Sequence, residues 1–456
     1  MSASGGASVA WLLARPRGSQ GWVAGLQVGV AAVATLLSFA VAVIALACWG
    51  APADGPGYQV LAVALAGILV LPIATLSAAA ARLSARGREE RLATLRLLGA
   101  SAARVRVLAV TEATASAVIG VLGGTAGALL LPLALPAFEA LPLLGVRISP
   151  AELALPLWLF LAVPVALVSI AAVSGLLGLR AVVVSPLGVR ARATAPRLSW
   201  VRPVLAVSLV TGAALLTRTV SPTWGVAAAV AGLGVALIAA MAVLGVLGPT
   251  VVLWIARGRA RRAADPAKLI ALRGVADDPK GAWRSVSVLA LATFVVVPVG
   301  SLLGVLDTIQ RSESGALMTP GQLTLFHDAR TLLIALAAVA FLVAACQVGM
   351  AQASAIVERR DLFLALRRIG MPVATMQRAR RASVMLPAVT AVSIAIVASA
   401  LLTFNVIAFG AVAAPLFTVA IVAVLGAGLL LVHGAVASTG PALRRELAAA
   451  ARGGAE

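Results

Sequence analysis

Long uninterrupted apolar runs constrain the fold of this chain more than any other feature. A helix needs about 20 apolar residues to cross the hydrocarbon core of a bilayer. The chain is 61% hydrophobic and 11% charged, whereas a soluble domain is nearer half apolar and a quarter charged. We therefore expect an all-α membrane protein with about ten transmembrane helices. The ten runs cover residues 22–49, 58–83, 107–134, 154–179, 203–218, 223–255, 285–306, 331–356, 384–406 and 415–437.

The fifth and sixth runs, which we call the joining pair, are the least regular part of this layout. The run 203–218 is short and begins at a proline, so it and the run 223–255 form either two full spans or a re-entrant hairpin.

The positive charges give these helices an orientation. Cytosolic loops of membrane proteins are enriched in Lys and Arg. With the N-terminus in the cytosol, all but four of the 36 Lys and Arg residues fall in cytosolic segments. We therefore expect both termini in the cytosol. The four exceptions are Arg147, Arg218, Arg311 and Arg330.

The composition also limits the partners and the chemistry. A formal net charge of +20 could indicate nucleic-acid binding, but the chain has one tyrosine and no basic stripe with interleaved aromatics, so we expect no nucleic acid and assign the lipid bilayer instead. Nearly all the cations are Arg rather than Lys, which is typical of a GC-rich bacterial genome and predicts the bacterial plasma membrane. Two cysteines and two histidines, all apart in sequence, predict no metal site, no cofactor and no catalytic residue in this chain.

A charged block occurs twice, each time after a long apolar run. It reads Arg-Glu-Glu-Arg-Leu-Ala-Thr-Leu-Arg-Leu-Leu-Gly at 88–99 and Arg-Arg-Asp-Leu-Phe-Leu-Ala-Leu-Arg-Arg-Ile-Gly at 359–370. Each block lies between the second and third of four successive spans, and six spans separate the copies. An even offset predicts parallel repeats, whereas many secondary transporters carry inverted ones.

These repeats predict the following organisation. We expect a cytosolic N-terminal segment 1–21, a first four-span unit 22–180 with a coupling segment 84–106, a linker with the joining spans at 181–283, a second unit 284–437 with a coupling segment 357–383, and a cytosolic tail 438–456.

The first block predicts a short amphipathic element held off the membrane, as the continuation of the helix that begins near Tyr58 and leaves the bilayer near Leu83. In the first copy, Leu92 and Leu95 share one side at helical spacing, with arginines around them, and Gly99 is a typical helix stop. One such block alone would indicate an interfacial helix that contacts anionic lipid headgroups. Two matching copies favour a docking surface for a two-fold partner.

The first block and the residues after it resemble a known family. The pattern Arg-Glu-Glu-x-x-x-x-Leu-Arg-x-Leu-Gly-Ala-Ser at 88–101, followed by Arg104 and by Thr111-Glu112-Ala113 at the start of a span, resembles the FtsX-like permease domain of the MacB/FtsX class of ABC transporters. The second copy departs from the pattern, because Met371-Pro372 follows its glycine and Ser383 stands where Glu112 would be. The ten-span layout is similar to the BceB-type permeases, without their large external domain.

The resemblance implies a transmembrane permease subunit that is not itself an enzyme. It implies a cytosolic ABC ATPase dimer as the partner, with ATP used by that partner, and the chain has no Gly-x-x-x-x-Gly-Lys-Ser/Thr loop. The expected cargo is a lipophilic or peptide substrate that is exported or extracted. The implied ATPase contacts are Glu90, Arg91, Leu95, Arg96 and Gly99, together with Asp361, Leu366, Arg367 and Gly370.

Two further features of the spans have both a functional and a structural interpretation. Glu112 is an ionisable group near the start of its span, so it is either functional or a carboxylate that pairs with Arg104 or Arg106. The glycines at 120, 123, 124 and 127 follow the small-xxx-small spacing, which lets helices approach closely, for static packing or for a moving contact.

Three alternatives to an ABC permease that carries peptide or lipophilic cargo remain from the sequence. One is an ion-driven secondary transporter. Another is a non-transporting mechanical regulator of an external partner. The third is a subunit that extracts a lipid or lipoprotein.

Overall fold

The computed structural model is described for residues 21–50, 57–59, 61–62, 69, 72–73, 76–77, 102–130, 156–184, 208, 225–311, 319–444 and 448. These residues are almost entirely helical, and no strand occurs among them. The helices are α2 (Gly21–Gly50), α5 (Ala102–Leu129), α7 (Leu157–Val184), α9 (Gly225–Ala260), α10 (Pro266–Asp277), α11 (Pro279–Arg311), α12 (Pro320–Glu358), α13 (Arg360–Arg368), α14 (Val373–Ala413) and α15 (Pro415–Ser438).

Seven of these helices are long and apolar enough to cross a membrane, namely α2, α7, α9, α11, α12, α14 and α15. The chain is thus an all-α, multi-pass membrane protein. An eighth predicted span, 107–134, appears as α5, whose described apolar part is the shorter stretch Thr114–Leu129. The predicted spans 58–83 and 203–218 lie largely outside the described residues, so the predicted number of ten is not tested.

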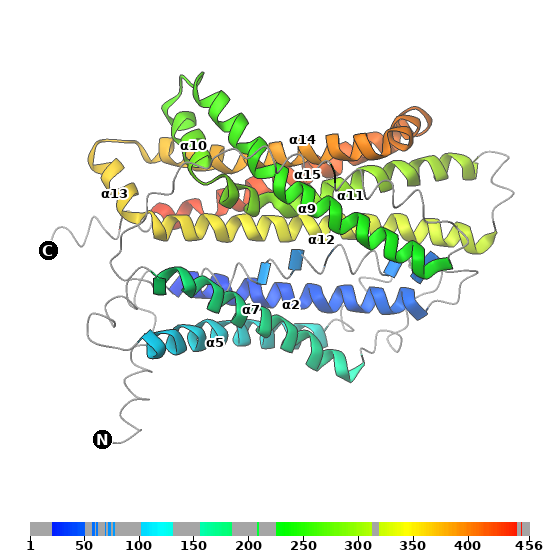
Figure 1. Cartoon of the computed structure of the whole chain (residues 1–456), viewed down its shortest axis with the longest axis horizontal. Coiled ribbons are helices and arrows are strands. Elements are labelled where there is room, and N and C mark those ends of the chain that lie inside the picture. The colour runs from blue at the N-terminus through cyan, green and yellow to red at the C-terminus, as the bar shows by residue number, and fades with distance from the viewer. Residues whose placement is uncertain are drawn as a thin grey trace.

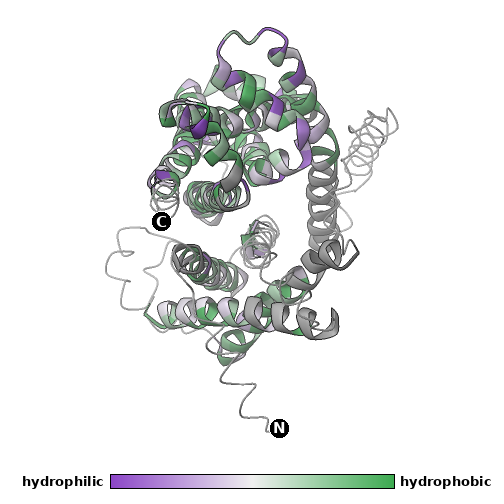
Figure 2. Cartoon of the chain, turned by 90° about the vertical axis from the view of Figure 1, so that its left-hand side faces the viewer, coloured by the Kyte–Doolittle hydropathy of each residue, from purple (hydrophilic) through white to green (hydrophobic). Residues whose placement is uncertain are grey.

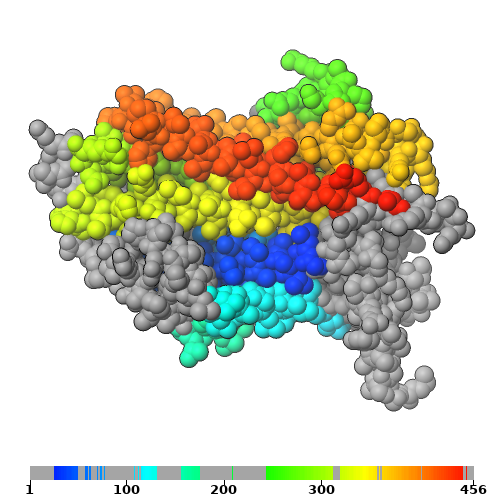
Figure 3. All heavy atoms as spheres, turned by 180° about the vertical axis from the view of Figure 1, so that it is seen from behind, coloured from blue at the N-terminus to red at the C-terminus, as the bar shows by residue number. Residues whose placement is uncertain are grey.

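The helices form two groups that meet along α2 and α12. Figure 1 shows α2, α5 and α7 on one side, and α9, α10, α11, α12, α14 and α15 on the other. Figure 2 shows the same two groups end-on. In the space-filling view of Figure 3, α2 lies beside α12 in the middle of the molecule.

Contacts between named residues give the direction of each helix. α2 and α5 run parallel, because Gly120 lies against Ala31 and Gly127 against Leu36. α11 and α14 also run parallel, since the Ser399 hydroxyl donates to the Phe294 carbonyl at 3.0 Å and that of Thr308 to the Ala413 carbonyl at 3.2 Å.

Two other membrane helices, α15 and α7, run in the opposite sense to their neighbours. α15 runs against α11, with Phe417 beside Gly304 and Ile421 beside Gly300. α7 likewise begins where α5 ends, since Leu159 clusters with Ala128.

These directions bring the charged segments to one end of the molecule. The ends of α9 and α12 and the starts of α11 and α14 lie together at the left of Figure 1, where α13 is labelled. Among the described Lys and Arg, only Arg311 and Arg330 lie at the opposite end. Arg311 pairs with Asp307 at 2.8 Å, and the Arg330 guanidinium lies 5.0 Å from the centre of the Phe417 ring. The described cations are therefore segregated to one end of the molecule, as predicted. The two exceptions, Arg311 and Arg330, each make a local contact.

α11 is the centre of the larger group and is its most buried membrane helix. It packs against α9, α12, α14 and α15, and its fully buried residues include Val286, Leu289 and Ala290. Small residues allow close helix contacts there. Any Cβ on Gly300 or Gly304 would lie about 3 Å from an α15 side chain.

Helix boundaries differ from the predicted spans at two places. α12 begins at Pro320, not near 331, so His327 and Asp328 lie in a helix instead of the external loop expected from the sequence. The segment 257–284, expected as a plain linker, contains the helix α10. Asp265 begins α10 by accepting the Ala267 N–H at 3.0 Å, and Pro266 fills its first position, which is a standard helix start.

Candidate functional site

The second predicted coupling segment folds into a sharp bend that we name the α13 elbow, residues 359–372. One residue, Arg359 (φ −109°, ψ 22°), separates the end of α12 from the start of α13. Backbone hydrogen bonds continue across the bend, from Arg359 N–H to the Ala355 carbonyl at 3.1 Å and from Phe363 N–H to the Arg359 carbonyl at 3.0 Å. The bend therefore interrupts the helical path without leaving a loop, and α13 turns away from the axis of α12 (Figure 1).

Gly370 ends α13 in a left-handed conformation, with φ +89°. The Gly370 N–H donates to the Arg367 carbonyl and the Met371 N–H to the Leu366 carbonyl, both at 3.0 Å. This pair of bonds is the Schellman motif, which satisfies the last carbonyls of a helix. A glycine is favoured there because a Cβ is strained at positive φ. The role of Gly370 as a helix stop follows from this geometry.

One side of the α13 elbow rests on an apolar seat made from the ends of the neighbouring helices. Phe363 and Leu364 pack with Ile356 at the end of α12 and with Leu443 beyond α15. Both Ile356 and Leu443 are fully buried. Displacement of the elbow must therefore move the ends of α12 and α15 or break these contacts.

The other side of the elbow is exposed and mixed in character. The side chains of Leu362 and Ile369 are 51% and 77% exposed, and Arg367 and Arg368 are exposed beside them. Exposed apolar side chains beside arginines fit a surface that binds another protein, because such interfaces have an apolar centre and are enriched in Arg.

The described structure reaches only part of the predicted contact set. It places Leu366 half-buried and Arg367 exposed on α13, with Gly370 at its end. Asp361 lies in α13 and Glu112 in α5, but their side chains are outside the described residues. The same is true of the whole first copy, so its pairing with the second is not tested. Those first-copy residues are Glu90, Arg91, Leu95, Arg96 and Gly99.

A polar contact at the end opposite the elbow joins α12 to the segment that follows α2. The hydroxyl of Tyr58, the single tyrosine of the chain, donates to Asp328 Oδ2 at 2.5 Å. Asp328 is 1% and Tyr58 5% exposed. We name this contact, with its apolar neighbours Cys48 and Leu332, the outer seam.

The outer seam was not predicted, because Asp328 lies before the predicted span 331–356. Its signal in the sequence is a weak one: Tyr58 and Asp328 are 270 residues apart, close to the 271-residue offset between the charged blocks. A second contact lies deeper along the same two segments, where Gln347 Nε2 donates to the Pro72 carbonyl at 3.4 Å.

The glycines predicted to permit close packing do so between α2 and α5. A Cβ on Gly120 would lie 2.5 Å from Ala31 Cβ, and one on Gly127 2.8 Å from Leu36 Cδ1. Gly124 meets Ala32 and Thr35 in the same way. By contrast, Gly123 has nothing within 4 Å, so three of the four glycines form the contact.

A buried arginine connects α14 to the end of α15. Arg380 is 8% exposed and donates through Nη2 to Thr439 Oγ1 at 2.7 Å, and Thr439 in turn donates to the Val436 carbonyl at 2.8 Å. A cation at the C-terminal end of a helix is favoured by the helix dipole. Arg380 therefore holds the point from which residues 440–444 lead to Leu443 and the apolar seat.

The part of the chain that the structure describes holds no group of three or more His, Cys, Asp or Glu side chains placed to bind a metal ion. Comparisons of the chain with protein-family models, with curated proteins and with solved structures found no match.

Proposed function

We propose that this chain is the transmembrane permease subunit of an ABC-type transporter, driven by a separate ATPase that docks on the α13 elbow and on its counterpart at 84–106. The α13 elbow is the observation that carries the proposal. It presents Leu362, Ile369 and two arginines on one side and rests on buried contacts to α12 and α15 on the other. Such an element can bind a partner and transmit its movement.

The helix pairings support two units of the same build. α2 packs on α5 as α11 packs on α14, α5 on α7 as α14 on α15, and α2 on α7 as α11 on α15. These pairs occupy matching positions in the proposed units 22–180 and 284–437. We infer parallel four-helix repeats in which each unit carries one coupling segment, and the joining spans between them include α9.

The length of α12 suggests how movement would cross the membrane. Its 39 residues extend about 58 Å at 1.5 Å per residue, nearly twice the hydrocarbon thickness of about 30 Å. Its inner end continues into the α13 elbow, and its outer end forms the outer seam with Tyr58. When two ATPase subunits close on ATP, a push on the elbow would tilt α12 and change the contact between the two units at the outer seam.

The docking assignment is tested by charge reversal at the two equivalent arginines. The double variant R96E/R367E should enter the membrane normally and lose the ATP-hydrolysing protein that co-purifies with the tagged wild-type chain. Reversal of two exposed arginines outside both coupling segments, R261E/R262E, makes the same change of charge at the same end and should retain it. Retention of the ATPase, and of its stimulation, by R96E/R367E would show that the coupling segments are not its docking surface.

One observation favours a second candidate, ion-driven secondary transport. An ionisable residue inside a membrane protein is a functional candidate by default, and Asp328 is a fully buried carboxylate between the two helix groups. Transport by proteoliposomes that contain only this chain and a proton or sodium gradient, abolished by D328N, would establish that function. Dependence on added ATPase and ATP would exclude it.

A further inference from the structure

The hairpin between α9 and α10 carries a dense group of positive charge that the proposed coupling does not use. Arg257, Arg259, Arg261 and Arg262 are all exposed. Lys268 and Arg273 of α10 are exposed as well. We name residues 257–273 the basic hairpin.

One carboxylate lies among these cations, and it caps a helix. Asp265, the single carboxylate in the basic hairpin, caps α10 through the Ala267 N–H. No ion pair joins the hairpin cations to a carboxylate within the described ranges of the chain. With six cations against one carboxylate, the basic hairpin carries a net charge of +5.

Packing fixes the hairpin to the bundle and directs its charges outward. α10 buries Ala267, Ala271, Leu272 and Val275, which share one helical face, and it packs on α14 and α9. The turn from α9 is short, with hydrogen bonds from Arg261 N–H to the Arg257 carbonyl and from Arg262 N–H to the Arg259 carbonyl. The basic hairpin is thus a rigid projection of the bundle.

The position of the hairpin matches the level of lipid headgroups. Arg257 and Arg259 belong to the last turn of the membrane-crossing helix α9. Trp254, one turn earlier, is 56% exposed, as is typical of aromatic residues at a membrane interface. Five residues beyond Trp254 correspond to about 7 Å of helix, which is about the thickness of one headgroup layer.

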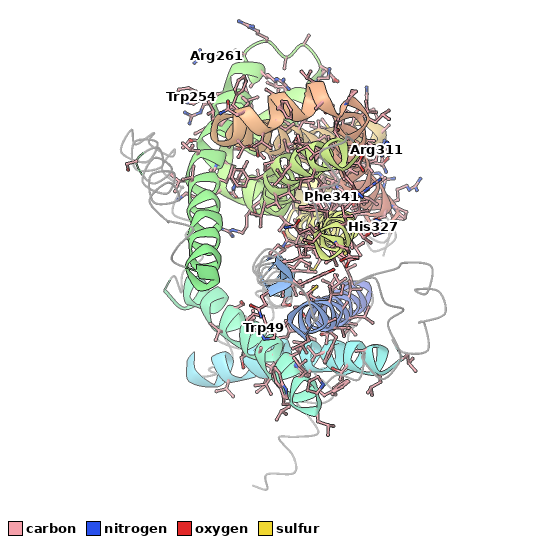
Figure 4. All side chains as sticks on the ribbon, turned by 90° about the vertical axis from the view of Figure 1, so that its right-hand side faces the viewer. Trp49, Trp254, Arg261, Arg311, His327 and Phe341 are labelled. Atoms are coloured by element: carbon pink, nitrogen blue, oxygen red, sulfur yellow. The ribbon has the colours of Figure 1, made fainter. Side chains whose placement is uncertain are left out.

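The views of the molecule agree with a lipid-facing location. Figure 2, seen from the end where α13 lies, shows hydrophilic residues at the outer rim of the larger helix group. In Figure 4, Trp254 and Arg261 lie at this rim, on the side away from α2, α5 and α7. The cations are therefore placed at the edge of the bundle, where a bilayer would surround it.

We propose that the basic hairpin binds the headgroups of anionic phospholipids in the leaflet on the side of the α13 elbow. Clusters of four to eight Lys and Arg directly beyond a transmembrane helix attract anionic lipid surfaces. The guanidinium group forms paired hydrogen bonds to phosphate oxygens. The interaction anchors the tilted helix α9 and the α10–α14 contact to the membrane surface, independently of any ATPase.

The test measures lipid binding to the purified full-length chain. Native mass spectrometry in detergent, with an equimolar mixture of phosphatidylglycerol and phosphatidylcholine, gives a dissociation constant for each lipid. Wild type should bind phosphatidylglycerol about tenfold or more tightly than phosphatidylcholine. The variant R257Q/R259Q/R261Q/R262Q, which keeps only Lys268 and Arg273 of the six hairpin cations, should lose most of this preference.

Two double variants distinguish a loss of lipid binding from a change of membrane topology. R261Q/R262Q leaves the last turn of α9 intact and should lower the preference about threefold, whereas R378Q/R381Q removes the same charge from α14 and should leave the preference unchanged. The proposal would be overturned if R261Q/R262Q and R378Q/R381Q lowered the lipid preference equally, or if wild type showed no preference for phosphatidylglycerol. It would also be overturned if R261Q/R262Q kept the lipid preference and lost a co-purifying protein, since the surface would then belong to that protein.

Discussion

The outer seam gives the most quantitative prediction, through the change Tyr58→Phe. This change removes one hydroxyl and leaves the shape of the ring intact. Asp328 is 1% exposed, and Tyr58 is the side-chain donor to it among the described residues. A buried donor or acceptor that loses its hydrogen-bond partner costs about 1–3 kcal/mol. We expect Tyr58→Phe to lower the free energy of unfolding by about 2 kcal/mol.

The assay is reversible unfolding in mixed micelles with increasing denaturing detergent, followed by helical circular dichroism. Ser438→Ala removes an exposed hydroxyl at the opposite end of the bundle and should change the free energy by less than about 0.5 kcal/mol. The double variant Tyr58→Phe/Asp328→Leu removes both polar partners and should recover part of the loss, because no buried polar group is left unpaired. A loss below about 0.5 kcal/mol for Tyr58→Phe would refute a stabilising role for this hydrogen bond.

Three further predictions concern helix packing and the α13 elbow. Gly124→Leu should destabilise the α2–α5 contact by about 1–3 kcal/mol, whereas Gly123→Leu, with nothing within 4 Å of its Cβ, should be near neutral in the same unfolding assay. Gly370→Ala should cost about 1–2 kcal/mol at φ +89° and increase protease cleavage near the elbow; unchanged cleavage would contradict the helix-stop role. Leu443→Ala removes a buried contact of the α13 elbow and should speed amide hydrogen exchange across 360–368. The control Leu430→Ala, at a side chain that is 72% exposed, should leave this exchange unchanged.

The hydropathy of the sequence was sufficient to predict most of the membrane helices. The runs 384–406 and 415–437 lie within α14 and on α15, and the alternation of directions agrees with the distribution of arginines. The start of α12 was placed too late because Asp328 and Arg330 lower the local hydropathy. In the structure a tyrosine and a phenylalanine ring accommodate these two charges, so the helix continues through them.

The candidate site was predicted only in part, for a physical reason. The amphipathic pattern of 360–368 and the glycine at 370 are local signals, and both α13 and its Schellman end follow from them. The seat of the elbow depends on Leu443, and the outer seam on a partner 270 residues away. No local pattern specifies such distant contacts. The short helix α10 was overlooked although the Asp265-Pro266 pair marks its start.

The claim that the α13 elbow receives a separate ATPase is tested most directly by site-specific photo-crosslinking in the cells that make the protein. A photoreactive residue at position 369, where Ile369 is 77% exposed, should capture a cytosolic protein with nucleotide-binding motifs. The same probe at position 397, on the exposed face of Val397 in α14, should capture only lipid. Capture of lipid alone at both positions, or labelling of position 369 from outside the cell, would contradict the account.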